Sequence, residues 1–208
     1  ASVDEAEQAL EGVAITDTPF NEQLGVSELH WMISDADRTI VVEYMADGMH
    51  VYDDTLEVLT NQPTFPYHKE NVRNYMSITP EFPKPVTWDK DTFSAYGSGS
   101  GMRGLPGDFY SPSRFVRAAY FNSHYPEQNG EQANVLRLFK TLQGAAMVVG
   151  GAKMDNGDFE YTTYTSCFSP TTMSYYYSSY EDPTIREYDL DAVGADGGKA
   201  VAVPQKAA

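Results

Sequence analysis

Two polar residues, Asn61 and Arg114, stand where their side chains could take part in catalysis. Asn61 follows the apolar pair Val58-Leu59 and comes two positions before Pro63, a pattern that predicts the end of a buried strand followed by a turn. A carboxamide at such a strand end is well placed to donate its N–H to an oxyanion that forms during acyl transfer. One donor of this kind contributes about 2.7–4 kcal/mol of transition-state stabilisation.

Arg114 lies in the first turn of a helix predicted over residues 111–125, with Ser111 as the N-cap and Pro112 at the first helical position. Since the helix dipole disfavours a cation in the first turn, an arginine there is expected to have a partner that offsets this cost. Taken alone, the residue types favour simpler roles, a turn residue for Asn61 and a surface salt bridge for Arg114.

Other kinds of catalytic or binding site find little support in the sequence. The glycine-rich segment "GSGSGMRGLPGD" lacks the G-K-[ST] ending of a phosphate-binding loop, and no G-x-S-x-G motif is present. Cys167 lies within an expected strand without a neighbouring base to activate its thiol, so a structural role is favoured. No histidines have metal-ligand spacing, and we expect neither a metal site nor a cofactor. The four histidines are His30, His50, His68 and His124.

The composition excludes several classes of function. The 208 residues carry 30 acidic and 14 basic side chains, a net charge of −16, and such a surface repels nucleic-acid phosphates. No apolar run approaches the roughly 20 residues that a membrane span requires, and no secretion signal opens the chain. The single cysteine excludes an internal disulfide framework. We therefore expect a cytoplasmic protein that binds neither nucleic acid nor membrane.

The expected elements alternate between strand meanders and helices. A helix over residues 1–13 begins with a capping box, in which Glu5 stands three positions after Ser2. Two strand meanders that flank helices favour an α+β fold with stacked sheets and outer helices, an αββα sandwich. The expected strands are "ELHWMIS", "TIVVEYM", "MHVYDD" and "EVLT", then "FEYTTYTSCFS", "TMSYYYSSY" and "TIREYDL". The remaining helices are expected over 67–76, 111–125 and 130–147.

A long segment rich in proline and glycine, residues 77–108, interrupts this pattern. Loops of such length are uncommon in compact domains and are usually functional, intersubunit or disordered. Aromatic residues within it argue against disorder, so we expect an excursion that packs against another surface, such as a second subunit. These aromatic residues are Phe82, Trp88, Phe93 and Tyr96.

Several separate motifs, in the same order, resemble the choloylglycine hydrolase family. They run from Ser2 to about Leu190 and are "LHWMISDADRTIVVEYMADGMHVYDD", "VLTNQPTF", "GLPGD", "SPSRFVRAAY", "YTTYTSC" and "YYYSSYEDPTI". This family holds bile salt hydrolases and penicillin V acylases, which are N-terminal-nucleophile amidases with an αββα core. The motifs are most similar to the bile salt hydrolases of gut bacteria. The resemblance implies that residues 1–208 form a single domain, the C-terminal portion of that fold.

The resemblance also implies an activity and a role for individual residues. In this family an N-terminal cysteine attacks the substrate amide, its own α-amino group acts as the base, and water hydrolyses the acyl-thioester. Asn61 would be an oxyanion donor, and Arg114 would organise charge near the nucleophile. Phe20 and Leu24 would line one wall of a pocket for conjugated bile salts. Residues 77–108 would be the assembly segment of a homotetramer.

The sequence departs from the family pattern at its start. Family members begin at the nucleophile, whereas this chain begins at Ala1, inside the family pattern, and alanine carries no nucleophilic atom. We therefore expect that roughly the first third of the enzyme is missing, with the catalytic cysteine, and that these 208 residues alone are inactive. With the N-terminal segment supplied, we expect hydrolysis of glycine- or taurine-conjugated bile acids.

Two alternatives stay open at this point. A penicillin V acylase would use the same residues but accept a small, flat phenoxyacetyl group in place of a steroid. A non-catalytic ligand-binding module would rest on the tyrosine-rich strands and the acidic surface, although alternating aromatics on strands more often reflect sheet packing. Such a module predicts saturable binding by these residues alone, without dependence on a further segment.

Overall fold

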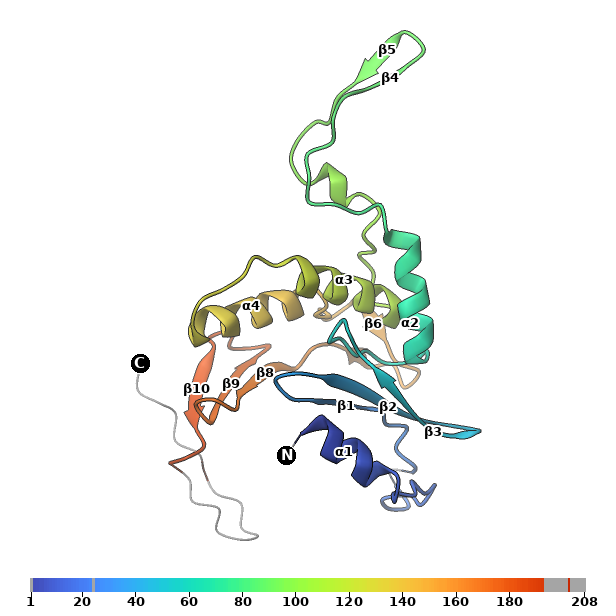
Figure 1. Cartoon of the computed structure of the whole chain (residues 1–208), viewed down its shortest axis with the longest axis vertical. Coiled ribbons are helices and arrows are strands. Elements are labelled where there is room, and N and C mark those ends of the chain that lie inside the picture. The colour runs from blue at the N-terminus through green and yellow to red at the C-terminus, as the bar shows by residue number, and fades with distance from the viewer. Residues whose placement is uncertain (1, 24, 193–201, 203–208) are drawn as a thin grey trace. The chain divides into compact units, whose positions relative to one another are not determined.

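The computed structural model describes residues 2–23, 25–192 and 202 of the chain. The polypeptide forms two compact units, residues 1–119 and 120–208, which both combine helices with antiparallel strands (Figure 1). The expected α+β composition is therefore present in each unit. The expectation that residues 1–208 form a single domain stays a prediction.

The first unit is built on a three-stranded antiparallel sheet with the order β1-β2-β3. In the central strand Val42 lies opposite Trp31 on one side and Val51 on the other. The first five residues of this strand are all buried, so both of its faces are covered, which explains its continuous apolar sequence. The strands are β1 (Trp31–Ser34), β2 (Thr39–Met45) and β3 (Gly48–Asp53).

Helix α1 (Val3–Leu10) covers one face of this sheet. Its buried Val3 packs with Ile40 and Val42, two residues of β2 that alternate onto the same face. Full burial of aliphatic side chains of this size stabilises a fold by about 1.5–3 kcal/mol each. The helix ends three residues earlier than the expected boundary at residue 13.

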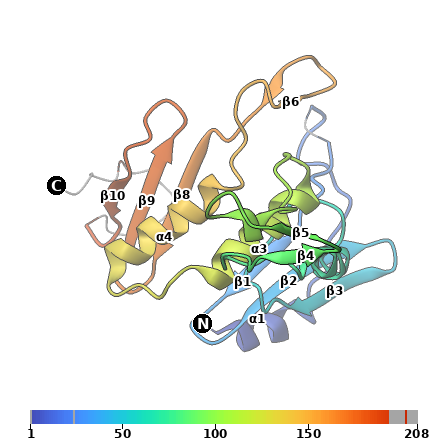
Figure 2. The same ribbon diagram turned by 90° about the horizontal axis from the view of Figure 1, so that it is seen from above.

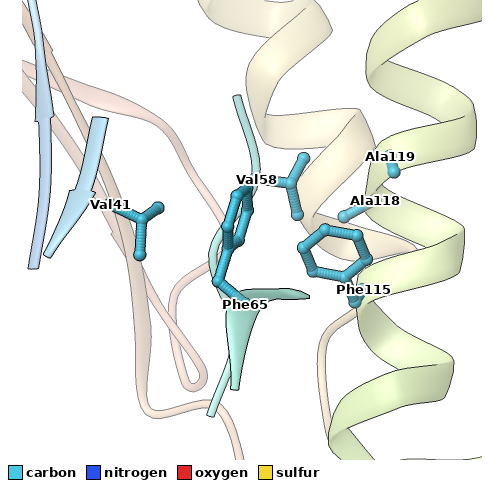
Figure 3. Close-up of a cluster of buried hydrophobic side chains, with 6 residues drawn as sticks. All are labelled: Val41, Val58, Phe65, Phe115, Ala118 and Ala119. Atoms are coloured by element: carbon cyan, nitrogen blue, oxygen red, sulfur yellow. The ribbon is translucent and has the colours of Figure 1, made fainter. Parts of the chain in front are cut away.

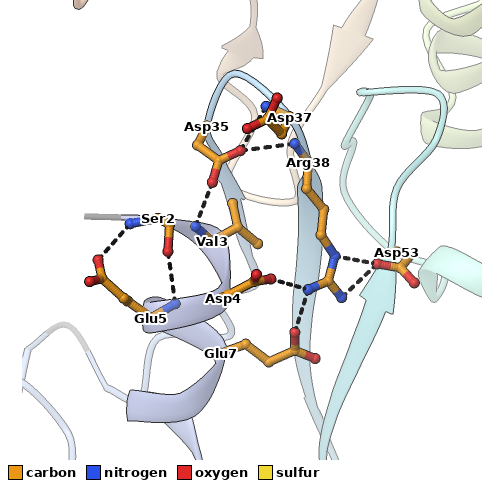
Figure 4. Close-up of polar contacts among 9 residues, drawn as sticks. All are labelled: Ser2, Val3, Asp4, Glu5, Glu7, Asp35, Asp37, Arg38 and Asp53. Carbon is orange, nitrogen blue, oxygen red and sulfur yellow. Dashed lines mark hydrogen bonds and ion pairs between the residues drawn. The ribbon is translucent and has the colours of Figure 1, made fainter.

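Polar contacts fix α1 at its start and along its side (Figure 4). The expected capping box is present, because Ser2 Oγ accepts the Glu5 N–H and the Glu5 carboxylate accepts the Ser2 N–H. Arg38, in the turn between β1 and β2, joins the helix to the sheet through three carboxylates. Their hydrogen bonds raise the pKa of Arg38 above its ordinary value and keep it charged. The three carboxylates belong to Asp53, Glu7 and Asp4.

The opposite face of β2 packs against a second apolar cluster (Figure 3). Two aromatic rings in it, Phe65 and Phe115, meet edge to face with their centroids 6.3 Å apart. They come from α2 (Phe65–Asn71), which continues as a 3-10 turn η1 (Val72–Tyr75), and from α3 (Ser111–His124). The buried members of the cluster are Val41, Val58, Phe65, Phe115, Ala118 and Ala119.

Residues 57–60, expected as a short strand, belong to no strand of the described chain. The Asp54 carboxylate accepts the main-chain N–H groups of Leu56, Glu57 and Val58, each at 2.9 Å. These bonds turn the chain directly after β3 and occupy donors that a strand partner would need. Burial raises the pKa of Asp54, while the three N–H groups act in the opposite direction. The expectation of a strand here was wrong, because it left out this side-chain acceptor.

Residues 77–108 form an excursion that leaves the end of η1 and returns to the start of α3 (Figure 1). It contains a hairpin and a 3-10 turn η2 (Ser100–Met102). At its base the Thr79 N–H donates to the carbonyl oxygen of Gly101 at 3.1 Å. The approach is close enough that a Cβ at Gly101 would lie 2.5 Å from the Thr79 carbonyl oxygen, so only glycine fits. The hairpin strands are β4 (Val86–Trp88) and β5 (Asp91–Phe93).

The second unit is a three-stranded antiparallel sheet, in the order β10-β9-β8, with helix α4 (Glu131–Gln143) packed on it (Figure 2). Val135 and Phe139 of the helix contact Tyr176 of the sheet, whose hydroxyl donates to Glu131 Oε1 at 2.8 Å. The strands are β8 (Tyr164–Ser169), β9 (Ser174–Ser179) and β10 (Arg186–Asp189), and a separate hairpin pairs β6 (Ala152–Lys153) with β7 (Phe159–Glu160).

Cys167 is half-buried on β8, beside the cluster formed by α4 and the sheet. Burial raises the pKa of the Cys167 thiol, and the nearby Glu131 carboxylate raises it further. Both effects disfavour the thiolate that a nucleophile requires. These surroundings agree with the structural role expected from the sequence.

Candidate active site

The two predicted catalytic residues, Asn61 and Arg114, meet in the first unit although 53 positions separate them in the chain. Arg114 Nη2 donates to Asn61 Oδ1 at 2.6 Å. Arg114 Nε donates to the carbonyl oxygen of Phe109 at 3.1 Å, which holds the guanidinium beside the first turn of α3. The partner expected for an arginine in this turn is thus at least in part the carboxamide of Asn61.

The main chain of Asn61 is held as firmly as its side chain. Its carbonyl oxygen accepts the Ser111 hydroxyl at 2.6 Å and lies 2.8 Å from Nε2 of His68. Ser111 is the first residue of α3 and His68 belongs to α2, so two helices converge on one carbonyl oxygen. The preceding hydroxyl, Thr60 Oγ1, lies 3.0 Å from Ser111 Oγ and tightens the same junction.

These contacts determine which way the Asn61 carboxamide points. Since Oδ1 faces the Arg114 guanidinium, Nδ2 occupies the other arm of the amide, on an exposed side chain. Within the part of the chain that the structure describes, no residue accepts a hydrogen bond from this nitrogen. An N–H donor that is aimed outward and held by a fixed neighbour is the arrangement that stabilises an oxyanion.

A carboxylate of β2 fixes the start of α2, directly after Asn61 and the turn that follows it. After the Asp54 turn the chain enters α2, whose first N–H, at Phe65, donates to Glu43 Oε1 at 2.8 Å. Glu43 is a buried residue of β2, and Thr64 makes no side-chain cap bond, so the strand supplies the carboxylate that caps this helix. A carboxylate at a helix N-terminus is also favoured by the helix dipole.

The start of α3 is tied to the end of the excursion. The buried Arg117 guanidinium donates through Nη1 to the carbonyl oxygens of Pro106 and Asp108, both at 2.7 Å. Burial lowers the pKa of Arg117, and the nearby Asp108 carboxylate opposes that shift. The Ser113 hydroxyl donates to Asp108 Oδ2 at 2.9 Å and lowers the pKa of that carboxyl. The segment "GLPGDF" is thereby fixed beside Arg114.

Of the two residues expected to line a substrate pocket, Phe20 and Leu24, the structure describes only Phe20. Phe20 is 82% exposed, in a turn where its N–H donates to the carbonyl oxygen of Gly25 at 3.2 Å. It makes no hydrogen bond or ring contact with Asn61 or Arg114 within the described chain. Leu24 lies outside the described residues. Their role in a pocket stays a prediction.

Sequence reasoning missed two residues of the site, His68 and Ser111. The sequence placed Ser111 at a helix start and His68 within a helix, and both placements are correct. Their contact with Asn61 depends on how α2 and α3 pack, which no local pattern encodes. The signal that could have found them is a polar residue at a position whose neighbours in the sequence predict burial, because a buried polar side chain needs a hydrogen-bond partner.

Comparison with known proteins defines the class and then the family. A solved structure of a cysteine-to-alanine mutant of conjugated bile acid hydrolase from Clostridium perfringens matches with a TM-score of 0.87 at 32% identity, over 100% of this chain and 62% of that one. The chain therefore has the expected α+β fold of N-terminal-nucleophile hydrolases. Residues 1–202 match the linear amide C–N hydrolases of the choloylglycine hydrolase family, and the chain belongs to this family.

Two further proteins differ widely in their sequence identity to this chain. A bile salt hydrolase/transferase of Bifidobacterium longum subsp. longum is 51% identical over 204 residues, covering 97% of this chain and 63% of that protein. Penicillin V acylase from Agrobacterium tumefaciens matches with a TM-score of 0.65 at 20% identity, over 92% of this chain and 52% of that one, which shows a shared fold only. The chain thus spans about 62–63% of the length of its nearer relatives.

Two features are absent from the described residues. No helix among them is both long and apolar enough to cross a membrane. Among the same residues, no group of three or more His, Cys, Asp or Glu side chains could hold a metal ion.

Proposed function

We propose that this chain carries the oxyanion-binding part of an amidase that hydrolyses conjugated bile salts. The observation that carries the proposal is the hydrogen bond from Arg114 to Asn61 Oδ1, in a member of a family of linear amide C–N hydrolases. The 51% identity to a bile salt hydrolase/transferase, against a likeness in fold alone to a penicillin V acylase, favours a bile salt as the substrate.

The proposed reaction follows the chemistry that the family resemblance implies. The thiolate of an N-terminal cysteine, supplied by a segment outside these 208 residues, bonds to the amide carbonyl carbon, and the carbonyl π electrons move to oxygen. Asn61 Nδ2 donates to this oxyanion, while Arg114 holds Oδ1. Collapse of the oxyanion breaks the C–N bond, and glycine or taurine leaves with the proton taken from the thiol. Water then hydrolyses the thioester and releases the bile acid.

The apolar part of the substrate is assigned to the loop that follows α1. Phe20 offers an almost fully exposed aromatic ring, and a steroid is a large, rigid apolar surface that such a ring can cover. With Leu24 it would form one wall of the pocket. Replacing Phe20 by serine is then expected to raise KM for glycocholate more than it lowers kcat.

Assembly and location complete the proposal. The excursion exposes large aromatic side chains around its hairpin, and exposed apolar surface of this kind is typical of an interface. We assign it to contacts between four copies of the chain. The cytoplasm is the proposed location, testable by fractionation. The exposed aromatic residues are Phe82, Trp88, Phe93 and Tyr96.

The test joins these 208 residues to the N-terminal segment of the Bifidobacterium longum relative and compares three substrates, glycocholate, taurocholate and penicillin V. We expect release of cholate from the bile salts to be faster than cleavage of penicillin V. A preference for penicillin V would assign the protein to the acylases. A folded chimera that cleaves none of the three, together with saturable glycocholate binding by the 208 residues alone, would favour the non-catalytic module.

A further inference from the structure

A buried histidine lies directly behind the Asn61 main chain. His68, on α2, is 1% exposed, and its ring stacks on Phe115 of α3 with centroids 4.7 Å apart and an interplanar angle of 12°. Its Nε2 lies 2.8 Å from the carbonyl oxygen of Asn61. Burial of an imidazole costs free energy unless a hydrogen bond compensates, because its polar nitrogens lose contact with water. The buried position of His68 therefore indicates a role beyond packing, through its contact with Asn61.

The partner of Nε2 decides where the proton of His68 resides. A carbonyl oxygen only accepts hydrogen bonds, so Nε2 carries the proton and acts as the donor. Burial lowers the pKa of His68, and the hydrogen bond to Asn61 raises it only in part. Two titratable groups face the ring, Glu43 of β2, which raises its pKa, and His30, which lowers it. The contact with Asn61 therefore assigns the proton to Nε2, and the lowered pKa favours the neutral ring although a main-chain hydrogen bond to Pro63 also opposes the shift.

Two donors on one carbonyl oxygen hold the peptide that carries the catalytic carboxamide. His68 approaches from α2 and Ser111 from α3, at 2.8 and 2.6 Å. Arg114 then holds the tip of the same residue through Oδ1. With both its main chain and its side-chain oxygen fixed, Asn61 has little freedom left to move Nδ2. A displacement of about 1 Å at such a position can lower a rate by about 100-fold.

We propose that His68 is a positioning residue for Asn61, and that its Nε2–H fixes the peptide from which the carboxamide reaches the oxyanion. This inference rests on the proposed function, since it assumes that Asn61 acts as the oxyanion donor. His68 itself touches neither substrate nor nucleophile in this scheme. It acts only through the carbonyl oxygen of Asn61.

The test uses two substitutions in the complete enzyme, the chimera described above. His68→Leu fills the site without a donor, whereas His68→Gln places an amide N–H close to where Nε2 was. We expect His68→Leu to lower kcat for glycocholate about 10- to 100-fold with KM within about twofold, because the interaction lost serves the transition state. His68→Gln should recover at least about a third of the wild-type kcat.

The control is His124→Leu, at an exposed histidine. His124 also bonds a main-chain oxygen, that of Tyr120 at 2.9 Å, and stacks on an aromatic ring 4.2 Å away, but it belongs to the end of α3. We expect its replacement to leave kcat and KM unchanged. Equal losses in His68→Leu and His124→Leu would overturn the inference, as would an unchanged kcat in His68→Leu.

Two further measurements decide the matter if His68→Leu does not fold. The imidazole nitrogen spectrum of the unsubstituted protein should show His68 with its proton on Nε2, and a proton on Nδ1 alone would overturn the inference. Ser111→Ala removes the other donor to the same oxygen and should lower kcat with little change in KM. An unsubstituted chimera that hydrolyses no amide would refute the proposed function itself, whereas normal wild-type activity with the His68 proton on Nδ1 alone would refute only the positioning role.

Discussion

An asparagine side chain offers a donor or an acceptor according to the direction in which its amide is turned, and a half-turn about χ2 exchanges the two. At Asn61 the Arg114 guanidinium makes this choice by bonding Oδ1 at 2.6 Å. Hydrogen bonds to a charged group contribute about 1.5–3 kcal/mol, and about 1.4 kcal/mol corresponds to a factor of ten in population. One arginine is therefore sufficient to keep the donor directed outward in most molecules.

The first prediction concerns this donor. Asn61→Ala in the complete enzyme is expected to lower kcat for glycocholate about 10²- to 10³-fold. Asn61→Asp is the sharper control, because a carboxylate retains the contact with Arg114 but has no N–H to donate, and we expect a comparable loss. Steady-state kinetics of both variants provide the measurement. A loss below about threefold in Asn61→Ala would reduce Asn61 to a turn residue.

A second prediction at the residue scale concerns acid titration of Asp182, between β9 and β10. Hydrogen bonds from Arg186 and then from Thr184 lower the pKa of Asp182 from 3.8 to about 2. A depressed pKa means that this carboxylate stabilises the fold above pH 4 and that the contribution is lost as the pH falls toward 2. The carboxyl carbon resonance should titrate near 2 and move back toward 3.8 in Arg186→Gln. A midpoint near 3.8 in the unsubstituted protein would contradict the contact.

At the scale of elements, β2 contributes to both apolar clusters of the first unit, because α1 covers one of its faces and α2 and α3 cover the other. This arrangement also positions the site, since α2 and α3 bring His68 and Ser111 to the same oxygen. Phe65 and His68 of α2 both pack against Phe115 of α3 and so join these two helices. Stability and site geometry are therefore linked through Phe115.

Phe115→Ala is expected to lower the free energy of unfolding by about 3–5 kcal/mol, because it leaves a cavity in a fully buried site. Phe168→Ala is a suitable control, since that ring is exposed on β8 and surface changes usually stay within about 0.5 kcal/mol. Urea unfolding of both variants gives the comparison. Equal midpoints for the two variants would show that the Phe115 cluster is not a core.

Interactions between residues that are close in the sequence could be predicted, whereas those between distant residues could not. The capping box of Ser2 and Glu5 spans three residues and was predicted correctly. The prediction of a strand over 57–60 was wrong, because the main-chain N–H groups there donate to the Asp54 carboxylate and are not free to pair with a neighbouring strand. The pairing of Asn61 with Arg114 spans 53 residues, and the family resemblance suggested their roles without giving the contact.

At the scale of the whole molecule, the excursion over 77–108 presents apolar surface that the first unit does not use. Trp88 is 73% exposed, and within the described chain its ring pairs with that of Phe93, with the two centroids 5.6 Å apart. We expect Trp88→Ser to lower the association state of the complete enzyme, while Trp88→Phe retains it. Sedimentation equilibrium separates the two. A wild-type protein that is monomeric at all concentrations would contradict the proposed tetramer.

The closed base of this excursion has a consequence for engineering. Thr79 is hydrogen-bonded to Gly101, and Arg117 donates to the carbonyl oxygens of Pro106 and Asp108 on the returning chain. The two chain segments at the base of the excursion are therefore held in place by contacts outside the hairpin, and this base is called the neck below. Residues 80–100 could therefore be exchanged for a short turn without changing the hydrogen bond between Asn61 and Arg114. The shortened protein is expected to keep the unfolding midpoint of its parent core, and other hairpins could be grafted at the same neck to choose new assemblies.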